Sequence, residues 1–176
     1  MASAKTREAS STSDLWRRCA EDERPLGVRV GVGAVVTDRQ GRVLLVRHHP
    51  SEGPRKSFWK GRWIGPGGML EFGESLEDGA RREVKEETGL EIEILRPLAP
   101  SDRLISWKGR KYLQVVYVDF LATVAEGSPE KDGLVEVRPG DDVGEARWFT
   151  RAEVAALGDR LHEDTRALLV RAGIIL

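Results

Sequence analysis

The chain has 176 residues, of which 40% are hydrophobic and 32% are charged, and its formal net charge is −1. This length suits one well-packed domain. The near-neutral charge excludes a general electrostatic attraction to nucleic acid or to an anionic membrane, so we expect no stable nucleic-acid binding. The sequence contains no run of about 18 apolar residues, so no transmembrane helix is predicted.

Residues 1–26 are predicted to form a flexible tail or peripheral arm, and residues 27–176 a single domain. The first segment is polar and rich in serine, and it lacks the apolar stretch of a secretory signal peptide. The single cysteine, Cys19, permits no intrachain disulfide. We therefore expect a cytoplasmic protein.

The domain begins with a predicted β-hairpin. Residues 28–38 and 43–49 are rich in β-branched and aliphatic side chains, and Gln40-Gly41 between them suits a tight turn. A loop rich in Gly, Pro and charge follows. The short segment Trp63-Ile64 then leads into GPGG, which we expect to interrupt regular structure.

A helix comes next, with Ser75 as its predicted N-cap and Gly89 as its left-handed C-cap. After it, the pattern predicts strands over residues 90–95, 104–107, 112–124 and 145–149, a long loop over 126–144, and closing helices over 150–157 and 162–173. This order predicts an α/β (α+β) fold, a mixed but antiparallel-rich sheet between helices.

Three glutamates of the predicted helix carry the chemical signal. Glu83, Glu86 and Glu87 stand at positions i, i+3 and i+4, so their carboxylates share one arc and repel by roughly 0.2–0.5 kcal/mol per pair. Carboxylates gathered beside an apolar stripe are stabilised by a cation. Oxygen ligands without nearby Cys or paired His favour Mg²⁺, or Mn²⁺ as a substitute.

The surrounding residues resemble a known signature. From Gly68 to Leu90 the chain reads GMLEFGESLEDGARREVKEETGL, which matches the Nudix box at all of its 23 positions. The segments WIGPGG before the box and EARWFT after the long loop are also similar to this family. The chain thus resembles the Nudix hydrolases, and the resemblance implies the Nudix fold for residues 27–176.

The resemblance also implies a role for each matching residue. The carbonyl of Gly68 and the carboxylates of Glu83, Glu86 and Glu87 are implied as ligands of divalent metal ions. Arg82 is implied to orient the glutamates. Glu74 is implied to tie the loop before the helix to the helix itself, with Gly89 as a structural residue of the motif.

The implied reaction is hydrolysis of a phosphoanhydride bond in a nucleoside diphosphate derivative, by a water whose pKa the metal lowers. Glu83 and Arg82 are expected to contribute to catalysis. Glu86 is the favoured general base, and in the acidic loop before the last strand Glu145 is the alternative.

Substrate contacts are predicted from residues around the box. Gly67 lets the backbone approach a phosphate closely, and Trp59 or Trp107 offers an aromatic face for a base. Arg47 is a candidate for a phosphate contact, and Glu71, which stands just before Gly73-Glu74 of the box, is a candidate for a further substrate contact.

The expected partner is a small-molecule nucleotide, either a nucleoside triphosphate, oxidised ones included, or a nucleotide sugar such as ADP-ribose. Two alternatives stay open: a nucleotide sensor without hydrolysis, and a pyrophosphohydrolase of RNA 5′ ends. A homodimer is also considered, because many relatives dimerise.

Overall fold

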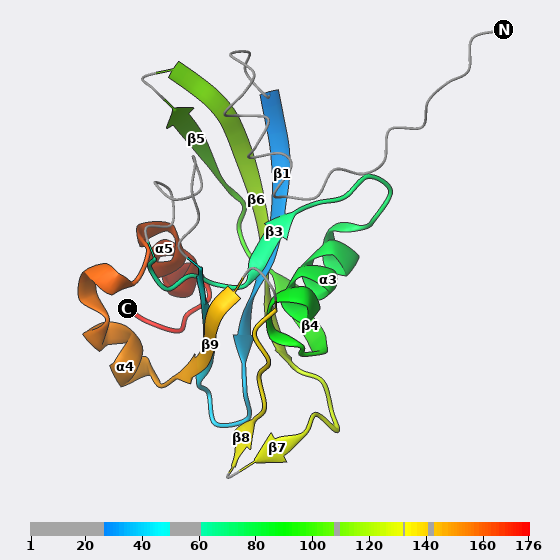
Figure 1. Ribbon diagram of the computed structural model, residues 1–176, viewed down its shortest axis with the longest axis vertical. Coiled ribbons are helices and arrows are strands. Elements are labelled where there is room, and N and C mark those ends of the chain that lie inside the picture. Colours follow the sequence, from blue (N-terminus) through cyan, green and yellow to red (C-terminus); the bar gives the residue numbers. More distant parts are fainter. Residues whose placement is uncertain (1–26, 50–60, 108–109, 132, 141–142) are drawn as a thin grey trace, which may run out of the picture.

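The computed structural model describes residues 27–49, 61–107, 110–131, 133–140 and 143–176, so the predicted tail over 1–26 lies outside the described residues. A mixed sheet has the order β4-β6-β1-β2-β9, with β3 paired to β1 and β5 to β6 (Figure 1). Its strands are β1 (Gly27–Thr37), β2 (Val43–His48), β3 (Gly67–Met69), β4 (Ile92–Pro97), β5 (Ser101–Trp107), β6 (Arg110–Val124) and β9 (Val143–Phe149). The helices are α3 (Leu76–Thr88), α4 (Arg151–Ala156) and α5 (Glu163–Arg171), with a 3₁₀ turn η1 (Gly158–Arg160).

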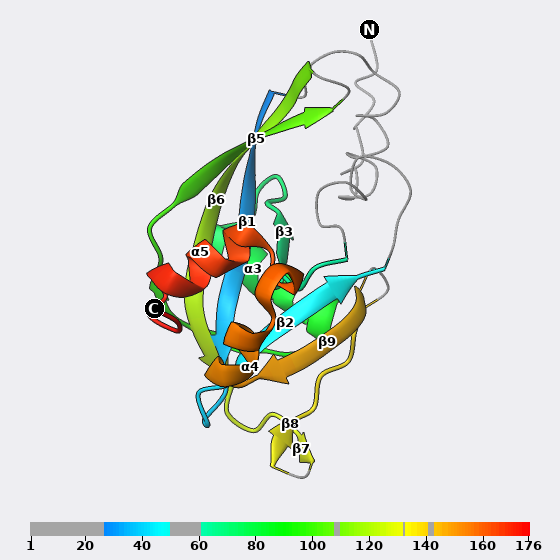
Figure 2. The same cartoon turned by 90° about the vertical axis from the view of Figure 1, so that its left-hand side faces the viewer.

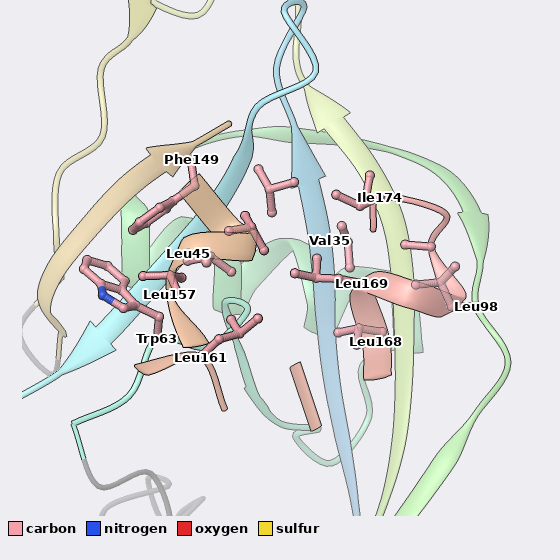
Figure 3. Packing of buried hydrophobic residues seen from close by; sticks show 13 residues of the cluster. Val35, Leu45, Trp63, Leu98, Phe149, Leu157, Leu161, Leu168, Leu169 and Ile174 are labelled. Carbon is pink, nitrogen blue, oxygen red and sulfur yellow. The ribbon is translucent and has the colours of Figure 1, made fainter. Parts of the chain in front are cut away.

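Helices cover both faces of the sheet, which confirms the predicted fold class. On one face, Ala80 of α3 packs against Val32 and Phe120. The other face carries α4 and α5 (Figure 2). There, Leu45, Trp63 and Phe149 belong to a hydrophobic core that lies between the sheet and these two helices (Figure 3). From the C-terminal region this core contains Val154, Leu157, Leu161, Leu168, Leu169, Ala172 and Ile174.

The centre of the sheet is the parallel pair β1 and β6, which runs in register from Gly27 opposite Leu113 to Thr37 opposite Thr123. The predicted hairpin of β1 and β2 is present, and Asp38 holds its turn by accepting from the backbone N–H of Gln40 and of Arg42. The two strands pair directly only at Thr37 and Val43 and then diverge (Figure 2). β1 is therefore free to pair with β3 in its middle, at Gly31, Val32 and Gly33.

Ile64 and Pro66, which precede β3, lie where the two strands diverge. Ile64 exchanges both backbone hydrogen bonds with Val46, and the carbonyl of Pro66 accepts from the N–H of Ala34. This arrangement brings the glycines that precede the box against the centre of the sheet.

Two sequence predictions were wrong. GPGG was expected to interrupt regular structure, but Gly67 and Gly68 belong to β3, where they pair with Gly33 and Val32. The glycines permit this strand because a Cβ on Gly67 would lie 2.6 Å from the carbonyl oxygen of Val32. The expected loop over 126–144 also contains a small hairpin of β7 (Glu130–Lys131) and β8 (Leu134–Val135).

The segment after β8 fastens the C-terminal end of α3. The N–H groups of Arg138 and Gly140 donate to the carbonyls of Thr88 and Glu87, at 2.8 and 3.0 Å. These carbonyls belong to the last turn of the helix and have no partner within it. The end of α3 that carries Glu87 is therefore fixed by the chain that leads into β9.

Among the described residues, no helix combines the length and the apolar character that a bilayer crossing requires.

Candidate metal and phosphate site

Helix α3 carries the predicted carboxylates, and local sequence fixes both of its ends. The Ser75 side chain accepts from the N–H of Asp78, and Gly89 takes a left-handed conformation with φ of 73° and donates to the carbonyl of Lys85. Ala80 and Val84 are fully buried against the sheet. Both caps therefore lie where the sequence predicts them.

The three glutamates differ in exposure. The side chains of Glu83 and Glu87 retain only 8% and 10% of their accessible surface, whereas Glu86 retains 60%. Burial raises the pKa of Glu83 to about 7; Arg82 opposes this increase, and the nearby carboxylates of Glu87 and Glu86 reinforce it. Glu83 is thus a carboxylate whose charge the protein alone does not fully stabilise.

Arg82 lies between the carboxylates. Its Nη1 donates to Glu83 Oε1 at 3.0 Å and to Glu86 Oε2 at 3.2 Å. Its Nη2 donates to the Met69 carbonyl at 3.1 Å, at the end of β3. One guanidinium therefore holds two of the predicted metal ligands and the strand beside them.

Glu74 joins the loop before the helix to the helix itself. Its two oxygens accept from Arg82 Nη2 and Nε at 2.8 and 3.1 Å, a bidentate pair, and Oε1 also accepts from the N–H of Glu71 at 2.6 Å. The hydrogen bond from Arg82 is the main reason that the pKa of Glu74 lies below its usual value. The Glu71 side chain is exposed, so its backbone makes the contact.

The glycines of β3 form the wall against which the carboxylates pack. A Cβ on Gly68 would overlap the Glu83 carboxylate. The N–H of Gly67 donates to Glu87 Oε2 at 2.9 Å. Backbone and carboxylate therefore meet at a distance that no side chain would permit.

His48 is a site residue that sequence reasoning missed. Its Nε2 lies 3.2 Å from Glu87 Oε1, and its side chain is 9% exposed. His48 ends β2, and its approach to α3 follows from the packing of helix on sheet. The only sequence signal is its place at the end of an apolar strand.

Arg47 and Glu145 pair with each other rather than with the box. They are direct partners across β2 and β9, and their side chains form an ion pair. Arg47 also lies over the Trp63 ring, with 5.3 Å from Cζ to the ring centroid. Since Trp63 packs with α4 and α5, this pair lies on the opposite face of the sheet from α3.

Of the two predicted aromatic contacts, the structure describes only the backbone of Trp107, and it lies away from the box. Trp59 lies outside the described residues. The backbone of Trp107 pairs with Arg110 at the tip of the β5–β6 hairpin, beyond the level at which β1 begins. Gly67 and Gly68 pair much further along β1.

The site fits a hard divalent cation by its donor set. Glu83 lies against Gly68, Glu87 lies against Gly67, and Glu86 shares Arg82 with Glu83, so every candidate ligand offers oxygen. Within the described part of the chain, no three His, Cys, Asp or Glu side chains are placed so that they could hold a metal ion together. Three observations therefore support a divalent cation here: the oxygen donors, the packing of the Glu83 carboxylate against Gly68, and the raised pKa of Glu83.

Comparison with known proteins identifies this arrangement. The family model described as NUDIX domain matches residues 27–170. The oxidized purine nucleoside triphosphate hydrolase of Mus musculus is 35% identical over 95 residues, which are 54% of this chain and 53% of that protein. The match thus spans about half of that relative's length.

Solved structures share the fold. A MutT NUDIX hydrolase from Burkholderia pseudomallei superposes with a TM-score of 0.58 at 26% identity, over 82% of this chain and 97% of that one. A bifunctional NMN adenylyltransferase/ADP ribose pyrophosphatase from Francisella tularensis, solved with AMP and a manganese ion, gives a TM-score of 0.58 at 19% identity, over 90% of this chain and 44% of that one.

Gly68→Ala tests whether the glycine is needed for the position of Glu83. The new methyl group displaces that carboxylate, so we expect kcat to fall at least about tenfold, since small misplacements of reacting groups cost this much or more. The melting temperature should stay near that of the wild type. Gly65→Ala is the control, because its Cβ would have no neighbour closer than 3.7 Å. Equal activity of the two variants would contradict this role of Gly68.

Glu83→Gln tests the cost of the buried carboxylate in metal-free buffer. The folded-state pKa of about 7 lies above the ordinary value of 4.5, so the stability contributed by this group is present below pH 4.5 and is lost as the pH rises through 7. We expect the variant to exceed the wild type in stability by roughly 1–3 kcal/mol at pH 8 and by less at pH 5. Urea unfolding at both values measures the difference. A difference in stability between variant and wild type that is the same at both pH values would contradict the raised pKa of Glu83.

Proposed function

The chain belongs to the Nudix family, and on that premise we propose that it is a hydrolase that cleaves a phosphoanhydride bond in a nucleoside diphosphate derivative. The observation that carries the proposal is the packing of Glu83 against Gly68. It places a desolvated carboxylate, whose pKa is raised to about 7, at the backbone of β3.

We propose Mg²⁺ as the cofactor, with Mn²⁺ as a substitute. The manganese ion in the Francisella tularensis structure belongs to that protein and supports a divalent ion in this fold. The carbonyl of Gly68 and the carboxylates of Glu83, Glu86 and Glu87 would hold the metal. When bound, it would neutralise phosphate charge and lower the pKa of a coordinated water.

The protein's own residues position the reactants. Arg82 holds Glu83 and Glu86 at 3.0 and 3.2 Å and so keeps both oriented toward the same region. Glu87 is held from two sides, by the N–H of Gly67 and by His48. Fixed carboxylates reduce the reorganisation that the transition state would otherwise require.

Glu86 is our choice for the general base. It is the most exposed of the three box glutamates, so water can reach its carboxylate. Glu145, the alternative, faces the other side of the sheet and pairs with Arg47. For Glu145 to act, that ion pair would first have to open.

The names of similar proteins support two candidate substrate classes. The mouse relative is named for oxidised purine nucleoside triphosphates, and the Francisella tularensis structure for ADP-ribose. We propose a nucleoside triphosphate, oxidised ones included, or a nucleotide sugar such as ADP-ribose. The cytoplasmic location and the homodimer expected from the sequence stay predictions.

A panel of nucleoside triphosphates and nucleotide sugars, assayed with Mg²⁺ for release of phosphate, pyrophosphate or nucleoside monophosphate, tests the activity. We expect turnover that requires metal and falls at least about 100-fold in Glu86→Gln and in Glu87→Gln, because each removes a charge that stabilises the transition state.

Glu77→Gln is the matched control, since Glu77 lies in the first turn of α3 and, among the described residues, its ion pair is with Arg81 at the surface of the helix. Wild-type rates in both box variants would show that the site is assigned wrongly. Binding of nucleotides without turnover across the whole panel would favour the sensor over the enzyme.

A further inference from the structure

The 138–140 segment, between β8 and β9, lies against the C-terminal end of α3 (Figure 1). An α-helix leaves its last four carbonyls without partners inside the helix, and here the carbonyls of Glu87 and Thr88 accept from the N–H groups of Gly140 and Arg138. Pro139, which has no N–H, stands between these two donors. Both N–H groups of the segment therefore bond to the helix.

Gly140 lies directly on the peptide group that joins Glu86 to Glu87. A Cβ on Gly140 would stand 1.9 Å from the carbonyl oxygen of Glu86, 3.0 Å from its carbonyl carbon and 3.4 Å from the Cα of Glu87. All three are backbone atoms, so no side-chain rotation could make room. The φ of Gly140 is not positive, so close contact and not backbone conformation requires glycine here.

This peptide group carries two of the proposed metal ligands. The Glu87 carboxylate lies 2.9 Å from the N–H of Gly67 and 3.2 Å from His48 Nε2. The Glu86 carboxylate lies 3.2 Å from Arg82 Nη1. Since these distances are close to the limit of a hydrogen bond, a movement of the helix end by about 1 Å would break the contacts.

The segment is also anchored to the sheet. The N–H of Val143 donates to the Gly140 carbonyl at 3.0 Å, and buried Val143 is the partner of His48 in the pairing of β9 with β2. The strand pair that brings His48 to Glu87 thus also holds Gly140 against the backbone of Glu86.

We infer that Gly140 is a positioning residue of the metal site: it fixes the peptide group between Glu86 and Glu87 and thereby sets where both carboxylates stand. The inference rests on the proposed function, since it takes Mg²⁺ to bind at these carboxylates. Gly140 acts through the backbone of the two glutamates and not on the substrate. Groups that orient metal ligands typically contribute about 10–100-fold to metal affinity or activity.

Gly140→Ala tests the inference, because the new methyl group must push the helix end and the segment apart. We expect the Mn²⁺ affinity of the substrate-free protein, measured from the EPR signal of unbound Mn²⁺, to weaken at least about tenfold, and kcat at saturating Mg²⁺ to fall by a similar factor. Both are measured at a temperature at which thermal unfolding shows the variant to be folded.

Gly65→Ala is the matched control, because the same methyl group would there have no neighbour closer than 3.7 Å. Its Mn²⁺ affinity and kcat should stay within about twofold of wild type. A folded Gly140→Ala protein that is less stable than wild type but equal to it in Mn²⁺ affinity and kcat would overturn the inference and leave Gly140 a structural role.

Pro139→Ala decides the matter if Gly140→Ala does not fold. It adds no atom at the helix and only frees the φ of the residue between the two donors, so we expect Mn²⁺ binding to weaken about twofold or more. Unchanged Mn²⁺ binding would then overturn the inference. Failure of the proposed function would look different, since the wild type would bind Mn²⁺ and turn over no nucleotide, and the affinities would still test Gly140.

Discussion

The bidentate pair of Arg82 and Glu74 is the interaction on which the site depends. It joins α3 to the loop before it, and the same guanidinium reaches the Met69 carbonyl, Glu83 and Glu86. The pKa of Arg82 is raised above its usual value chiefly by Glu74, whose own pKa is lowered by Arg82. Arginine suits this place because its planar donors serve several acceptors at fixed angles, which a lysine does not.

The gathering of carboxylates that supports function also lowers the stability of the folded protein. Burying Glu83 beside Glu87 raises its pKa to about 7, and Arg82 offsets only part of that cost. The apolar stripe of Ala80 and Val84, both fully buried, keeps the helix docked despite the repulsion. A divalent cation would relieve the remaining cost, so a site of this kind would bind metal and gain stability together.

The sequence predicted correctly those parts of the molecule whose structure is determined by neighbouring residues in the chain. Helix α3, with its caps at Ser75 and Gly89, follows from capping residues and the box. The contacts it missed are made between distant segments: β3 forms because Gly67 meets Gly33, and His48 reaches Glu87 because a strand end packs beside a helix. Glycine next to proline reads as a loop unless the partner strand is known.

A double-mutant cycle on Arg82 and Glu74 tests the central claim most directly. Urea unfolding of wild type, Arg82→Ala, Glu74→Ala and the double variant gives the coupling free energy between the two side chains. If this pair fixes the site, the coupling should be roughly 1.5 kcal/mol or more, well above that of the exposed pair Arg81 and Glu77 measured in the same way. A coupling below about 0.5 kcal/mol, the value of an ordinary surface pair, would contradict it.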